Sequence, residues 1–187
     1  MPDPAWTRVA TLRSPEQFRR HLEEGGLSIP FDDALAAPSD SPLARPVEAD
    51  GLRLGNRWCI LPMEGWDGTA DGRPTDLTRR RWRNFGRSGA KLVWGGEAAA
   101  VRHDGRANPC QLVIDGSTWE HLARLREDLV LAHEESFGKG AASDLVVGLQ
   151  LTHSGRYCRP DAWDRALPLV AFAHPILDRR FPGGVRV

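Results

Sequence analysis

The chain has 187 residues, with 25 Lys plus Arg and 25 Asp plus Glu, so its formal net charge is zero. A neutral chain has no overall positive field to attract nucleic acid or an anionic membrane, and we expect neither as a partner. No apolar stretch approaches the ~20 residues that span a bilayer. The N-terminus also lacks the apolar core of a secretory signal, so we expect a cytoplasmic protein.

The cysteines and histidines are scattered along the chain. Cys59, Cys110 and Cys158 lie far apart in sequence, and no C-x-x-C, H-E-x-x-H or H-x-H spacing occurs. This pattern argues against a disulfide framework and against a zinc site, so no metal is expected. Cys59 lies within an apolar run and is most simply a small core residue.

The N-terminal segment predicts one short helix followed by an arm. Ser14 suits the N-cap, and Gln17 would complete a capping box. Residues 29–46 are rich in proline and aspartate and show no sustained periodicity. We therefore expect residues 1–45 to form an N-terminal helix and arm, separate from residues 46–187.

The second segment opens with a predicted hairpin and then alternates apolar runs with amphipathic stretches. Asp50-Gly51 lies between two short strand-like runs, which is a strong hairpin signal. Each later apolar run is hydrophobic throughout, as a parallel sheet covered by helices requires. The predicted strands are 57–62, 90–94 and 145–151, and the predicted helices are 75–89 and 117–137, the second with a capping box at Ser117–Glu120. We expect Trp58, Trp82, Trp94 and Trp119 to pack in the core or between helices and sheet.

Two α/β architectures fit this order of elements, a doubly wound open sheet and an α/β barrel. A G-x-G-x-x-G turn after the first strand would favour the open sheet, and it is absent. The long loops and unusual residues follow the carboxyl ends of the strands, where barrel enzymes keep their chemistry. We therefore predict a partial (β/α)8 TIM barrel of the first three or four βα units. The residues after Leu151 offer at most one more strand, so this barrel cannot close.

Polar residues at the three strand ends are the candidates for chemistry. Gln150 lies between two leucines, and a buried amide without partners costs about 1–3 kcal/mol. From the residues alone, its simplest interpretation is a core amide bonded to a neighbouring strand. Glu97 could serve as an acid, although we favour an ion pair with Arg156 or Arg102. The three clusters span residues 61–68, 94–101 and 149–156.

Taken together, these clusters resemble the old yellow enzyme family of flavin-dependent NAD(P)H oxidoreductases. The motifs "GNR…LPM", "GGEAAAV…DGR" and "GLQLTHSGR" occur in the family's order, and the match runs from about Pro46 to Arg156. Each motif alone is weak, but three in order at successive strand ends are specific. The resemblance implies FMN as cofactor, NAD(P)H as electron donor, and hydride transfer through FMN to an electron-poor, enone-like small molecule.

The resemblance also implies roles for particular residues. The main chain of Ala98 would contact the flavin carbonyl region, and the Gln150 amide would pair with the pyrimidine edge of the ring. Trp66 matches a position where an aromatic side chain lies near the substrate. At Glu64 the family usually has Thr, Cys or Ala, so a carboxylate there would either disfavour the anionic reduced flavin or turn away. The backbone along the flavin ring would be that of Leu61, Pro62, Met63 and Glu64.

Parts of the family's machinery have no counterpart in this sequence. The residue pair that binds the acceptor carbonyl lies on a later strand, and the phosphate site lies between the last loops of the barrel. The catalytic residues are therefore unknown, and we expect weak or no FMN binding and negligible turnover from the isolated chain. Two alternatives stay open: a split barrel completed by a second polypeptide or an oligomer, and a non-catalytic or truncated product.

Overall fold

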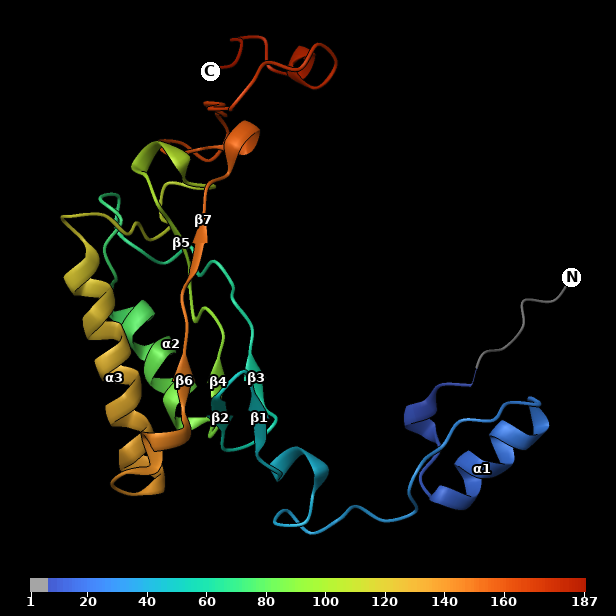
Figure 1. Cartoon of the computed structure of the whole chain (residues 1–187). Coiled ribbons are helices and arrows are strands. Elements are labelled where there is room, and N and C mark those ends of the chain that lie inside the picture. The colour runs from blue at the N-terminus through green and yellow to red at the C-terminus, as the bar shows by residue number, and fades with distance from the viewer. Residues whose placement is uncertain (1–6) are drawn as a thin grey trace, which may run out of the picture. The chain divides into compact units, whose positions relative to one another are not determined.

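The computed structural model describes residues 7–187, which fall into two compact units divided between Ser41 and Pro42 (Figure 1). Among its described residues, the first unit contains one α-helix, α1 (Pro15–Glu24). No helix within the described part of the chain combines the length and apolar character that crossing a membrane requires.

Helix α1 begins where the sequence predicts, with a small change in its cap. The Ser14 hydroxyl accepts a hydrogen bond from the Gln17 backbone N–H, as an N-cap serine should. The Gln17 side chain, however, accepts from the backbone N–H of Arg13 at 2.7 Å, one residue before the N-cap. In a capping box the Gln17 side chain would accept from the backbone N–H of Ser14, so this second hydrogen bond of the predicted box is displaced by one residue.

The predicted hairpin opens the second unit. Strands β1 (Val47–Ala49) and β2 (Leu52–Leu54) pair antiparallel around Asp50 and Gly51. These two turn residues have φ values of 49° and 79°. Positive φ at both central positions is what a type I′ turn requires, so the turn residues determine this hairpin.

A parallel sheet forms the centre of the second unit, and its strand order is β3-β4-β6. Strands β5 and β7 form a second parallel pair beyond the ends of β4 and β6. In Figure 1 both connecting helices lie on the same side of the sheet. The α/β class is as predicted, and the described strands do not close into a barrel. The bounds are β3 (Cys59–Ile60), α2 (Asp76–Arg87), β4 (Leu92–Val93), β5 (Ala98–Ala100), α3 (Trp119–Phe137), β6 (Val146–Val147) and β7 (Gln150–Thr152).

The two helices begin in different ways. Thr75 caps α2 through a reciprocal box with Thr78. The Ser117–Glu120 box predicted for α3 is wrong, because the N-cap is Thr118 and its side chain caps no helical N–H. The Thr118 hydroxyl instead donates to the backbone carbonyl of Val113 at 2.7 Å, and both groups are buried.

The core lies between the helices and one face of the sheet. Trp82, as predicted, is buried there against Val93 of β4 and Leu129 of α3. Gly86 lets the two helices approach, because a Cβ at this position would lie 2.2 Å from the Leu129 carbonyl oxygen. The core residues are Trp82, Val93, Ala99, Leu112, Leu122, Leu125 and Leu129.

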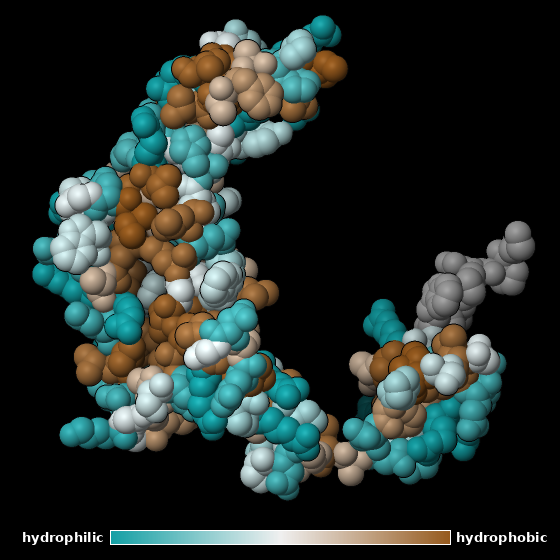
Figure 2. Space-filling view, in the orientation of Figure 1, coloured by the Kyte–Doolittle hydropathy of each residue, from teal (hydrophilic) through white to brown (hydrophobic). Residues whose placement is uncertain are grey.

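The other face of the sheet is largely uncovered, which corrects several predictions. Side chains alternate along a strand, so Leu61 and Trp94 lie opposite Ile60 and Val93, which face the core. Leu61 is 70% exposed and Trp94 is 58% exposed. Apolar surface runs along β6 and β7 in Figure 2. Among the predicted core residues, Cys59 and Trp94 are exposed on this open face. Trp58, just before β3, and Trp119, at the start of α3, are also more than half exposed.

Candidate cofactor-binding site at the strand ends

The ends of three strands meet at Gly95, directly after β4. Its φ is +61°, in the left-handed region that favours glycine. A Cβ on Gly95 would lie 3.0 Å from the Pro62 Cβ and 3.0 Å from the Gln150 Cβ. The absence of a side chain at Gly95 thus allows Pro62, after β3, and Gln150, at the start of β7, to pack against the same point.

Ala98 and Gln150 are also neighbours, because they are register partners across β5 and β7. The Gln150 side chain is exposed and forms no hydrogen bond with any of residues 7–187. It lies on the strand face opposite to Leu149, which packs against the core next to the helices. The interpretation of Gln150 as a bonded core amide is therefore wrong. Its amide is directed away from the helices and is free to bind a ligand.

The segment that follows β3 carries exposed apolar side chains. Leu61 is 70% exposed and Met63 is 75% exposed. Both lie next to Pro62 in sequence, and Pro62 packs at Gly95. The structure thus brings this segment to the same strand ends as Gln150. The flavin contacts predicted for Leu61, Pro62, Met63, Glu64 and Ala98 stay predictions.

Gln111 is a site residue that sequence reasoning missed. This fully buried amide joins three segments: its Nε2 lies 2.8 Å from the Ala98 carbonyl oxygen, 3.0 Å from Thr152 Oγ1 and 3.2 Å from Glu64 Oε1. Its Oε1 accepts from the Ala107 backbone N–H. Gln111 precedes an apolar run, which is the same kind of signal that drew attention to Gln150.

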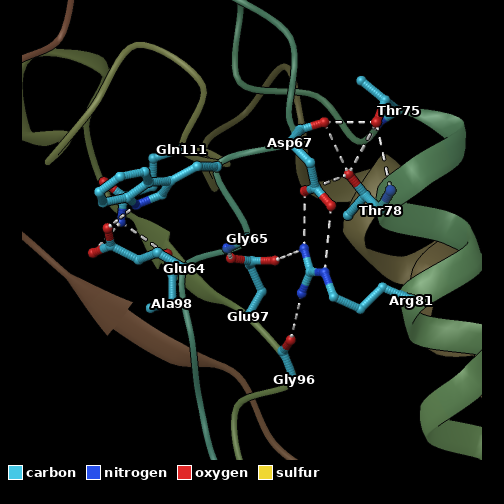
Figure 3. Close-up of polar contacts among 11 residues, drawn as sticks. Glu64, Gly65, Asp67, Thr75, Thr78, Arg81, Gly96, Glu97, Ala98 and Gln111 are labelled. Carbon is cyan, nitrogen blue, oxygen red and sulfur yellow. Dashed lines mark hydrogen bonds and ion pairs between the residues drawn. The ribbon is translucent and has the colours of Figure 1, made fainter. Parts of the chain in front are cut away.

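The Glu64 carboxylate is held by the chain's own donors. One oxygen bonds Gln111, and the other accepts from the Trp66 indole N–H at 2.9 Å. Figure 3 shows Glu64 directed toward Gln111 and Ala98. The carboxylate is thus hydrogen-bonded within the protein, and its predicted effect on a bound flavin stays a prediction.

Trp66 has a backbone conformation that is uncommon for a side chain of its size. Its φ is +53°, and non-glycine residues rarely adopt positive values. Its ring contacts the ring of Trp163, with centroids 5.5 Å apart and an interplanar angle of 54°. Both side chains are more than half exposed. The predicted substrate residue thus belongs to an exposed aromatic pair.

Glu97 forms an ion pair, as predicted, but with a different partner. It bonds Arg81 of α2 at 2.6 Å, and its side chain is only 1% exposed. Burial raises the pKa of the Glu97 carboxyl, while the charge and hydrogen bond of Arg81 act in the opposite direction. The two partners considered from the sequence are engaged elsewhere, Arg156 with Asp178 and Arg102 with Asp104.

This ion pair is part of a network that fixes the loop after β3. Glu97 accepts from the Gly65 backbone N–H at 2.9 Å, and Arg81 also bonds the carboxylate of Asp67 at 2.9 Å. Asp67 accepts in turn from the Thr78 hydroxyl in α2 (Figure 3). Burial acts to lower the pKa of Arg81, but Asp67 and Glu97 outweigh it and raise the pKa. The loop is therefore tied both to α2 and to the end of β4.

Comparisons with known proteins give a likeness of fold. No protein-family model matches the chain, and no curated protein matches it. The chain is similar to 2-naphthoyl-CoA reductase in complex with 2-naphthoyl-CoA, with a TM-score of 0.51 and 17% identity over 64% of this chain and 16% of that one. At this identity the likeness shows a shared fold.

Two further matches are similar over comparable stretches. The old yellow enzyme from Trypanosoma cruzi is 23% identical, with a TM-score of 0.48 over 64% of this chain and 29% of that one. Morphinone reductase in complex with tetrahydroNAD is 21% identical, with a TM-score of 0.48 over 70% and 32%. The chain thus spans no more than a third of each of these three structures.

Proposed function

We propose that this chain forms one side of the flavin site of an FMN-dependent NAD(P)H oxidoreductase of old yellow enzyme type. The observation that carries the proposal is the meeting of Pro62 and Gln150 at Gly95, with Ala98 paired beside Gln150. Pro62 and Gly95 follow the carboxyl ends of β3 and β4, and Ala98 and Gln150 lie a few residues beyond the ends of β4 and β6. This is the edge of a parallel sheet at which α/β enzymes place their cofactors. Bound FMN would supply hydride transfer from NAD(P)H to an electron-poor, enone-like acceptor.

The residues present suit the ring of the cofactor. The Gln150 amide can both donate and accept hydrogen bonds, as the pyrimidine edge of a flavin demands, and its side chain has no partner within residues 7–187. Exposed Leu61 and Met63 offer apolar surface beside it. In this proposal the chain binds and orients the ring, whereas the phosphate clamp and the acceptor-binding pair come from outside the described residues.

A titration with two flavins tests this proposal. Lumiflavin has the ring without the ribityl phosphate, so it should bind the chain about as weakly as FMN does. Amide NMR signals of Gln150, Met63 and Ala98 should shift with either flavin. Gln150→Leu should abolish these shifts, whereas Asn84→Leu, which removes an exposed amide from α2, should leave them intact.

Three results would count against parts of the proposal. Shifts confined to the helices, or no shift up to the solubility limit of the flavin, would refute a flavin site at the strand ends. One FMN retained per chain through gel filtration would contradict the proposal that these residues lack a phosphate-binding site. We expect the purified chain to lose its flavin on the column and to show negligible turnover.

A second candidate function is that of a component completed by another polypeptide. Strands β3 and β6 each pair with a single strand in the described part of the chain, so each leaves an open edge. An apolar groove beside β6 suits a further helix, because it is lined by Val147 and Leu149 of the sheet and by Trp119 and Leu122 of α3. Co-expression with the downstream reading frame should then restore tight FMN binding. A stable monomer with protected β6 amides would argue against this alternative.

A further inference from the structure

An exposed pair of tryptophans lies in the loops next to the proposed flavin-binding residues. Trp66 and Trp163 come from distant parts of the sequence, yet their rings lie 5.5 Å apart. Trp66 is 56% exposed and Trp163 is 51% exposed, so neither side chain is part of the buried core. Exposed rings in contact with one another offer π-faces on which a planar ligand can stack.

The orientation of this pair is built into the chain. Positive φ at Trp66 is unfavourable for a bulky residue and persists only where its surroundings hold it. The Glu64 carboxylate accepts from the Trp66 indole N–H at 2.9 Å. Its other oxygen bonds the buried amide of Gln111, which also bonds Ala98 of β5. The indole is thereby connected to the sheet through two side chains.

The same contact alters the electronic character of the indole. A carboxylate that accepts the indole N–H increases the electron density of the ring, and its own charge lies close by. Electron-rich aromatic faces attract cations and electron-poor rings. They discriminate against anionic rings, which the neighbouring carboxylate would also repel.

We propose that Trp66 and Trp163 form a stacking platform for a planar, cationic or electron-poor ring, with Glu64 as the positioning residue that sets the platform's orientation and charge. This inference deepens the proposed function, on which its biological meaning rests, because it names the class of ring that would reach the flavin side. Its test requires no flavin, so each can fail independently of the other.

Three small rings of similar shape test the platform. The probes are 1-methylnicotinamide, which is cationic, nicotinamide, which is neutral, and nicotinate, which is anionic. The chain has seven tryptophans, and their indole N–H signals can be followed separately by ¹⁵N NMR. The cation should shift the Trp66 and Trp163 signals saturably and bind at least about fivefold more tightly than nicotinate. The signal of Trp58, which is exposed just before β3, should not move.

Variants separate the two roles given to Glu64. Glu64→Gln keeps an acceptor for the Trp66 indole N–H but removes the charge, so the Trp66 signal should stay near its position while the preference for the cation falls. Glu64→Ala removes both, so the Trp66 signal should move and saturable binding should be lost. Trp163→Ala should also abolish binding, whereas Trp58→Ala, which removes another exposed tryptophan, is the matched control and should change neither property.

Several outcomes would overturn the platform. Equal binding of the three probes would refute the role of charge, and equal shifts of all exposed tryptophans would refute a specific site. An unmoved Trp66 signal in Glu64→Ala would refute the positioning role. If the pyridinium cation binds as expected but neither flavin shifts Gln150, the platform stands and the flavin proposal fails. If a flavin shifts the Gln150 signal but the pyridinium cation does not bind, the flavin proposal stands and the platform is refuted.

Discussion

The two faces of the central sheet differ in what covers them. On one face Val93 and its neighbours are buried beneath α2 and α3. On the other face Leu61 and Trp94 are more than half exposed, and the free amide of Gln150 belongs to that side. The two faces come from the same short strands, so strand sequence alone does not decide burial.

This difference separates stability from candidate function. Burying an apolar side chain stabilises the fold by about 1.5–3 kcal/mol, so the helix-covered face supplies most of the stabilisation. The open face gains little from its apolar groups, but it keeps them available for a ring or for another polypeptide. A buried network centred on Glu97 helps to fix the loop that borders the open face.

The sharpest test of this comparison replaces one leucine on each side. Leu129 is fully buried in α3, so Leu129→Ala should lower the free energy of unfolding by about 2–5 kcal/mol through lost burial and a residual cavity. Leu61 is 70% exposed, so Leu61→Ala should change it by no more than about 0.5 kcal/mol. Urea denaturation measures both. Similar losses for the two variants would show that the open face is covered in solution.

The next test removes the cation from the buried network. Arg81→Met leaves Glu97 without its charge partner, and breaking a fully buried pair costs about 3–5 kcal/mol. Because the Arg81 side chain is 24% exposed, we expect a smaller loss of about 2–3 kcal/mol.

Arg79→Met is the matched control for this network, since it lies on the same helix and pairs with Asp128 at 3.1 Å. Both partners of that pair are one-third exposed, at 33% each. Its loss should cost at most about 1 kcal/mol, measured by the same denaturation. Adding Glu97→Gln to Arg81→Met should recover part of the loss. Without such recovery, the cost would not arise from an unpaired carboxylate.

A third test concerns the point where the strand ends meet. Gly95→Ala places a Cβ on a residue in the left-handed region, 2.8 Å from the Gln150 backbone nitrogen and 3.0 Å from the Pro62 Cβ, and should cost about 1–3 kcal/mol. Gly148→Ala is the control, because its Cβ would meet Trp94 at an ordinary 3.5 Å. We expect less than about 1 kcal/mol there. Thermal unfolding with equal losses at the two glycines would argue against the close packing at Gly95.

Much of the fold could be predicted from local signals. The Asp50-Gly51 turn, the Ser14 cap and the order of strands and helices each follow from short-range chemistry, and all are present. Burial was predicted less well, because a continuous apolar run implies two covered faces. Trp94 lies in such a run and is exposed, since coverage depends on segments far from the strand.

The candidate site shows the same division. The motifs identified Gln150 and Ala98, whose register pairing follows from the parallel order of their strands. They could not identify Arg81 as the partner of Glu97, because helix α2 has several arginines and only its packing selects one. Gln111 is also an amide beside an apolar run, but it does not follow a predicted strand and was therefore not identified as a site residue. Sequence patterns thus locate strand ends better than they assign side-chain partners.

The smallest expected effect lies in the tail beyond the open face, where Asp178 holds Arg156. The hydrogen bond from Arg156, 2.6 Å long, lowers the pKa of Asp178 below its ordinary 3.8. A carboxyl with a lowered folded-state pKa contributes stability that is present above 3.8 and is lost as the pH falls through the folded value. The His174 backbone N–H also donates to Asp178, so its NMR shift should titrate with a midpoint below 3.8. Asp178→Asn should remove this titration, and Asp104→Asn should leave it. A midpoint at or above 3.8 would mean that the Arg156 contact does not persist in solution.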